Sequence, residues 1–149
     1  MRPPVADPVA NREIALHAAL YRAAWESNVG HGTKHFLLEP IAARELPAMN
    51  ITVREFRLRV LAALADLGVS IAWTTGSNGR PEANDFFPGT NHPATRLQIT
   101  IAERREGGRV IRGETEDWTV GAGSSRRGFT ATLEGGDWTL ARDRVRIVR

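Results

Sequence analysis

Apolar residues in the first half of the chain recur with the period of a helix. Over residues 8–26 and 53–67, an apolar residue returns every three or four positions, so these residues share one face of each segment. The first face holds Ile14, Ala18, Tyr21 and Trp25, and the second holds Phe56, Val60, Ala63, Leu64 and Leu67. The pattern predicts two amphipathic helices. Thr52 and Glu55 form a capping box before the second helix, and Gly68 is placed to end it.

Shorter apolar runs and a change of period predict strands. The stretches "KHFLLEPI" and "VSIAWT" each fit a short extended segment. After residue 96 the apolar positions alternate with a period of two, which is typical of half-buried strands. The alternating residues are Leu97, Ile99 and Ile101, then Phe129, Ala131 and Leu133, then Trp138 and Leu140. With a further strand over 109–120 and glycine pairs at 107–108 and 135–136, they predict a four-stranded antiparallel meander.

The glycine pair at 107–108 also predicts a register. A two-residue turn there gives the pairs Leu97 with Trp118, Ile99 with Glu116, Ile101 with Glu114 and Glu103 with Arg112. Because directly opposed residues share a face, Glu114 and Glu116 are expected on the apolar side. Burial and like charge together would raise the pKa of at least one of them, which is how general acids and bases arise. The alternative is that both carboxylates reach water where the sheet extends beyond the helices.

The second glycine pair fixes the end of the meander. It places Trp138 opposite Leu133 and Arg142 opposite Phe129, and Val120 is also expected opposite Phe129 across the "GAGSSRRG" loop. The opposite face would then be small, polar and rich in threonine. In a regular strand, odd-numbered and even-numbered residues lie on opposite faces. Val145 and Ile147 are odd-numbered, whereas Trp138 and Leu140 are even-numbered, although all four are apolar. This mismatch predicts a bulge or bend within residues 141–144.

These elements predict a single α+β domain over 1–149, with helices packed on one face of a curved antiparallel sheet. The helix "HAALYRAAWE" followed by "RLQITIAERREGGRVIRGETEDWTV" and "FTATLEGGDWTL" resembles the ketosteroid-isomerase-like and cystatin-like folds. That resemblance implies a cone-shaped ligand pocket, with Tyr21 donating a hydrogen bond to an oxyanion. The stretch "ESNVGHG" departs from the family pattern, and no aspartate occupies the family's base position. The chain also resembles small bacterial proteins of mobile cassettes, a likeness that no single motif carries.

Composition and charge exclude several classes of protein. The chain has no cysteine, which excludes disulfides, thiolate metal sites and thiol nucleophiles. No run approaches the roughly 20 apolar residues of a membrane span, and the first residues do not resemble a signal peptide, so a soluble cytoplasmic protein is expected. The net charge is +3, and residues 142–149 supply all of it. Their arginines alternate with Val145 and Ile147, which favours a strand over a disordered nucleic-acid arm.

Other motifs give weaker indications. His31, His35 and Glu39 are spaced by four, as on a metal-binding helix face, but the flanking glycines and Pro40 disfavour a helix. We therefore expect no metal and no cofactor. The "GAGSSRRG" stretch could cradle an anion, although a hairpin loop is the simpler interpretation. The turn-rich stretch 76–93 is long enough to be a lid or binding loop.

The sequence predicts a protein that binds a small, partly apolar molecule between helices and sheet. Glu114 and Glu116 are the candidates for catalysis, which is not established. The predicted ligand-binding residues are Tyr21, Trp118, Trp138 and Arg142. A first alternative is a homodimeric interaction module that associates through the threonine-rich face. A second is nucleic-acid binding through the C-terminal arginines, whereas no membrane partner is expected.

Overall fold

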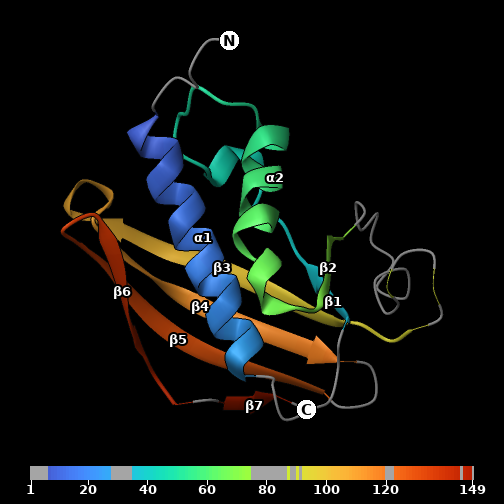
Figure 1. Cartoon of the computed structure of the whole chain (residues 1–149). Helices are drawn as coiled ribbons and strands as arrows, with labels where there is room; N and C mark the ends of the chain where they lie inside the picture. Colours follow the sequence, from blue (N-terminus) through green and yellow to red (C-terminus); the bar gives the residue numbers. More distant parts are fainter. Residues whose placement is uncertain are drawn as a thin grey trace.

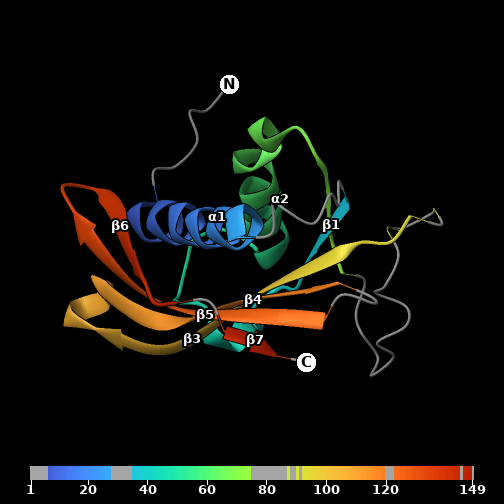
Figure 2. The same cartoon turned by 90° about the horizontal axis from the view of Figure 1, so that it is seen from below.

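The computed structural model shows two helices packed on one side of a curled sheet (Figure 1, Figure 2). It describes residues 7–27, 35–74, 87, 90, 92–119, 123–144 and 146–148. The helices are α1 (Pro8–Ser27) and α2 (Val53–Ala63), with short 3₁₀ turns η2 (Ala43–Glu45), η3 (Ala65–Leu67) and η5 (Glu106–Gly108). The strands are β1 (His35–Leu38), β2 (Ser70–Trp73), β3 (Thr95–Arg105), β4 (Val110–Thr119), β5 (Gly123–Glu134), β6 (Asp137–Arg142) and β7 (Arg146–Val148).

Local capping explains where the helices begin and end. Before α1, the Asp7 carboxylate accepts the backbone N–H of Ala10 at 3.1 Å. The side chain of Thr52 accepts the backbone N–H of Glu55 at 3.1 Å, as the capping box predicts. Gly68 follows η3 in the left-handed conformation with φ of 69°, so the predicted end is also confirmed.

The sheet runs in the order β2-β1-β3-β4-β5-β6, and β7 pairs with β5 beyond the end of β6. Strands β3 to β6 form the predicted antiparallel meander. Strand β1 pairs in parallel with both β2 and β3, so the prediction of a purely antiparallel sheet is wrong in this part. The reason is connectivity: α2 lies between β1 and β2 in the chain, and a helical crossover returns the chain to a parallel neighbour. The α+β class holds.

The core lies between the helices and the surface of the sheet that faces them, which we call the helix side (Figure 2). Residues of α1, α2 and four strands form one cluster there, including Leu16, Leu20, Tyr21, Phe36, Leu38, Phe56, Val60, Leu97, Ile99, Ile111, Phe129 and Ala131. The opposite surface, which we call the outer face, carries Arg96, Gln98, Glu114, Glu116, Trp118 and Arg126.

The predicted register of β3 and β4 is correct only near their turn. Glu103 pairs with Arg112 as predicted, but the pairing shifts between Ile101 and Glu103. One extra residue there forms a β-bulge, and beyond it Leu97 pairs with Asp117 rather than with Trp118. A shift of one position reverses the face of every following side chain.

The shift moves three predicted site residues away from the helices. Glu114, Glu116 and Trp118 lie on the outer face, where the sequence predicted them to be inward. Thr115 and Asp117 take the inward positions and are buried. The prediction that two glutamates line a helix–sheet pocket is therefore wrong.

The remaining pairings test the other half of the meander. Phe129 pairs with Gly113, not with Val120, because β5 already begins at Gly123 and includes most of the predicted loop. The pairs Leu133 with Trp138 and Phe129 with Arg142 are confirmed.

The predicted bend after β6 is also confirmed. Three residues, 143–145, separate Arg142 from Arg146, whereas only two, 127 and 128, separate their partners Phe129 and Arg126 on β5. The stretch 76–93 lies mostly outside the described residues.

Candidate functional site

A groove between α1 and β6 has the size of a ligand site. Its volume is about 460 Å³, and we call it the α1–β6 groove. Its lining includes Ala15, Ala18 and Ala19 of α1 and Trp138, Leu140 and Arg142 of β6. Figure 1 shows β6 running alongside α1.

The groove follows from small residues on one helix face. Ala15, Ala18 and Ala19 are spaced by three and four, so they stand on the side of α1 that lines the groove. Each of these side chains ends at Cβ, which leaves space between the helix and the opposing strand. On β6, Trp138, Leu140 and Arg142 alternate onto the helix side and form the other wall.

Arg142 closes the groove at the C-terminal end of α1. Its Nη1 donates to the backbone carbonyl of Ala23 at 2.9 Å and to Oγ of Ser27 at 3.4 Å. Its Nη2 lies 4.0 Å from the Glu26 carboxylate. A cation at this end of a helix also interacts favourably with the helix dipole. The predicted inward position of Arg142 thus places a fixed positive charge in the groove.

Arg22 supplies a second charge on the same wall. It donates to both carboxylate oxygens of Asp66 at 2.7 and 3.2 Å, and to the carbonyl of Ala63 at 3.2 Å. The hydrogen bond from Arg22 lowers the pKa of Asp66 below its ordinary value. These contacts fix α1 against the end of α2. Arg22 could not be selected from sequence patterns, because its partner Asp66 lies 44 residues away along the chain.

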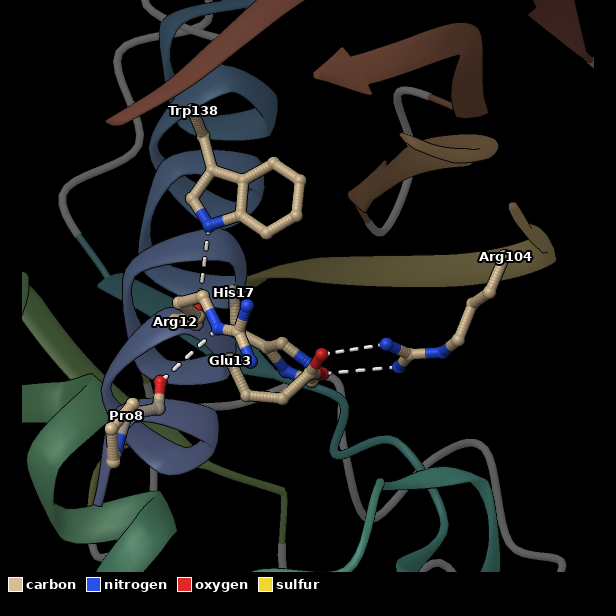
Figure 3. Close-up of polar contacts among 6 residues, drawn as sticks. All are labelled: Pro8, Arg12, Glu13, His17, Arg104 and Trp138. Atoms are coloured by element: carbon tan, nitrogen blue, oxygen red, sulfur yellow. Dashed lines mark hydrogen bonds and ion pairs between the residues drawn. The ribbon is translucent and has the colours of Figure 1, made fainter. Parts of the chain in front are cut away.

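Trp138 is held at the opposite end of the groove. Its indole Nε1 donates to the backbone carbonyl of Arg12 at 3.0 Å (Figure 3). The ring is thereby fixed between β6 and the N-terminal half of α1 as a rigid wall. A buried or half-buried tryptophan normally finds such a partner.

Near Trp138, a buried ion cluster joins α1 to β3 (Figure 3). Glu13 is 5% exposed, and Arg104 donates to its two oxygens at 2.6 and 3.0 Å. His17, 1% exposed, lies 2.9 Å from the same carboxylate. A carboxylate only accepts, so Nε2 of His17 carries the proton of this bond. The ring of His17 also makes an edge contact with Phe56 of α2 at 5.0 Å between centroids.

The electrostatics of this cluster favour ionised Glu13. Burial alone would raise the pKa of Glu13, but hydrogen bonds from His17 and Arg104 outweigh it and lower the pKa to about 2. Glu13 and His17 at positions i and i+4 were a recognisable pair within the apolar stripe. The alternation of apolar residues along β3 predicts that Arg104 points outward. The bulge turns Arg104 inward instead, so its contact with Glu13 could not be predicted from the sequence. Glu13, His17 and Arg104 satisfy one another by hydrogen bonds, so the geometry of the cluster indicates a structural role.

The other predicted site residues lie apart from the groove. Tyr21 is 1% exposed in the core, where its hydroxyl donates to the carbonyl of Glu39 at 2.5 Å. Burial raises its pKa above the ordinary value. Trp118 lies on the outer face, and Glu116 there pairs with Arg126 at 3.3 Å. Of the predicted residues, the structure brings together Trp138 and Arg142 at the groove.

Glu114 borders a larger hollow of about 670 Å³ on the outer face. Several charged residues line it, among them Glu103, Arg112, Asp143 and Arg144, together with Phe129. It has no tryptophan or tyrosine wall within the described residues. Ligand sites combine apolar walls with a few polar groups, which the α1–β6 groove matches better.

The described residues of the possible metal and anion motifs lie in or beside strands rather than in a helix or an open loop. His35 is the first residue of the short strand β1 and Glu39 follows its last, so the two do not share a helix, and His31 lies outside the described residues. Within the described part of the chain, no group of three or more metal-ligating side chains could hold an ion. Most of the "GAGSSRRG" stretch is strand, and Ser125 donates to the buried carboxylate of Asp117.

Comparison with known proteins gives no match among family models, curated proteins or solved structures. The resemblance to the ketosteroid-isomerase-like and cystatin-like folds, and to cassette proteins, therefore stays a prediction. None of the helices in the described residues combines the length and apolar character that crossing a membrane requires.

Proposed function

We propose that the chain binds a small, partly apolar molecule in the α1–β6 groove. The observation that carries this proposal is the groove itself, which joins an alanine-lined helix face to a fixed tryptophan and an arginine. Its volume of about 460 Å³ lies within the range of roughly 300–1,000 Å³ found for ligand sites. The two ends differ, with the indole of Trp138 at one and the guanidinium of Arg142 at the other.

This polarity defines the expected ligand. The alanines, Leu140 and the Trp138 ring offer an apolar surface to the body of the molecule. Arg142 uses Nη1 for its contacts with α1, and its guanidinium carries further N–H donors on Nη2 and Nε. The charge of Arg22 is paired with Asp66, and Glu26 balances part of the charge of Arg142 at the rim. A ligand with an apolar body and one carboxylate fits this arrangement.

A thermal-shift screen against a metabolite library tests the proposal. A ligand that binds only the folded state stabilises it by about 2.7 kcal/mol at a concentration of 100 Kd. Ala19→Phe fills the groove from its helix wall, so it should abolish the shift. Ala62→Phe, at an exposed position of α2, is the matched control and should retain it. A ligand whose shift survives Ala19→Phe would bind elsewhere, and the groove would lose its proposed function.

The alternatives remain predictions with their own tests. The outer face, expected to be small and polar, also carries Arg96, Arg112, Glu116 and Trp118, and a homodimer through this face stays a prediction. Light scattering across a concentration series would reveal such a dimer. Binding to random DNA that weakens steeply with salt would support the nucleic-acid alternative. Catalysis in the groove and a cytoplasmic location are likewise open to experiment.

A further inference from the structure

A second, much smaller hollow lies on the outer face, beside the end of β1. Its volume is about 70 Å³, room for about two water molecules. We call it the Arg96 pocket, and it is lined by Glu39, Arg96, Gln98, Glu116 and Trp118. The α1–β6 groove is on the helix side of the sheet, so the two sites share no residue.

The pairing of β3 and β4 positions the donor side of this pocket. Arg96 is directly opposite Trp118, and its guanidinium carbon lies 4.4 Å from the centroid of the Trp118 ring. This cation–π contact holds the guanidinium against the indole. The Nε of Arg96 is buried and has no hydrogen-bond partner. One N–H donor at the pocket is thus fixed in place and unused.

Glu39 supplies the acceptor side. Its backbone is fixed twice, because its N–H donates to the carbonyl of Leu97 at 2.9 Å and its own carbonyl accepts from Tyr21 at 2.5 Å. The Oε2 atom of Glu39 is buried and has no hydrogen-bond partner. The side chain of Glu39, which carries this buried oxygen, therefore lines the same hollow as the side chain of Arg96.

Two such groups at one hollow point to a bound partner. An unsatisfied buried polar group costs roughly 1–3 kcal/mol, and more when it is charged. Glu39 needs a donor and Arg96 needs an acceptor, so one group that carries both would satisfy them together. A carboxylate offers no donor to Glu39, and an ammonium offers no acceptor to Arg96. Glu116, the other carboxylate of the pocket, already pairs with Arg126 at 3.3 Å.

We propose that the Arg96 pocket binds a carboxamide group. The amide N–H₂ donates to Oε2 of Glu39, the amide oxygen accepts from Nε of Arg96, and the planar group lies beside the indole of Trp118. The amide belongs to a small metabolite or to an asparagine or glutamine side chain, which share this chemistry. The Arg96 pocket is independent of the α1–β6 groove, so the two proposals are tested by separate experiments.

Two-dimensional ¹⁵N–¹H NMR of the whole chain tests this proposal. The Nε–H resonance of Arg96 and the indole resonance of Trp118 are followed during titration with acetamide, and separately with acetate. Acetamide should shift both resonances saturably, and acetate should bind roughly tenfold or more weakly. The peptides Gly-Asn-Gly and Gly-Asp-Gly form a second pair, which distinguishes a peptide side chain from a free small amide as the source.

Variants locate the response. Arg96→Met and Glu39→Leu each remove one hydrogen-bonding partner and should abolish the acetamide response at Trp118. Arg112→Met, on the same outer face but outside the pocket, is the control and should leave it intact. The acetamide and acetate arms need only the unaltered chain, so a variant that does not fold leaves the test valid. Equal shifts with both probes, or no saturable shift with acetamide, would show that the pocket holds only water.

Discussion

Replacement of Glu13 by glutamine probes the buried ion cluster between α1 and β3. Glutamine keeps the size of the side chain and one carbonyl acceptor, but it removes the charge that Arg104 and His17 hold. The variant therefore imitates the protonated form of Glu13 at every pH. A comparison with the unaltered chain isolates the contribution of the carboxylate.

The magnitude follows from the pKa of Glu13. It falls from an ordinary value of 4.5 to about 2 in the folded chain. At about 1.4 kcal/mol for each tenfold change, folding favours the ionised form by about 3 kcal/mol. Because the folded pKa is depressed, this stability is present above pH 4.5 and is lost as the pH falls toward 2. At pH 3, about half of it remains by the same linkage relation.

Urea unfolding followed by tryptophan fluorescence at pH 7 and pH 3 measures the effect. Glu13→Gln should lower the free energy of unfolding by about 3 kcal/mol at pH 7 and by about half as much at pH 3. Glu55→Gln is the matched control, because Glu55 pairs with Arg59 at 2.9 Å on the exposed surface of α2. Exposed pairs contribute little, so this control should change stability by less than about 0.5 kcal/mol.

Two outcomes would refute the reasoning. A loss that is equal at pH 7 and pH 3 would mean that the charge of Glu13 is not the source of the stability. A loss as small as that of Glu55→Gln would mean that the hydrogen bonds of the cluster are solvated rather than buried.

Three further substitutions test the local geometry by thermal or urea unfolding. Gly113→Ala places a Cβ 2.0 Å from the backbone carbonyl oxygen of Thr100, so it should cost roughly 2–3 kcal/mol; a neutral result would contradict the close approach. Gly128→Ala meets the movable carboxylate of Asp143 at 2.3 Å and should cost less, under about 1 kcal/mol. Thr52→Ala removes the cap of α2 and should cost about 1 kcal/mol, whereas Thr52→Ser should be nearly neutral.

Elements whose stability is local could be predicted from the sequence. The helix boundaries depend on neighbouring residues such as Thr52 and Gly68, and both act as predicted. The hairpin at 135–136 is a tight turn with both glycines at positive φ. The pairing predicted from this turn is therefore correct as far as Arg142. The parallel pairing of β1 could not be predicted in this way, because it depends on where α2 returns the chain.

The predicted register of β3 and β4 was wrong for a different reason. Its turn carries three residues with positive φ, Glu106, Gly107 and Gly108, and it still gives the predicted pair of Glu103 with Arg112. The error begins at the bulge, which the alternation of Leu97, Ile99 and Ile101 does not reveal. Opposite Ile101 stands Gly113, whose position admits no side chain. A single glycine within a strand is the one sequence sign of such a close approach.

One extra residue near Ala102 determines the chemistry of both faces of the sheet. Without the extra residue, Arg104 would lie on the same face as Arg96 and point outward. Glu13 would then be a buried carboxylate without the guanidinium of Arg104 as a partner. With it, the strand turns Arg104 toward α1, and β4 turns Trp118 to the outer face beside Arg96. Both the ion cluster on the helix side and the Arg96 pocket on the outer face therefore depend on this bulge. A bulge costs the sheet a regular pair, and here the buried charge-assisted hydrogen bonds of Glu13 offset that loss.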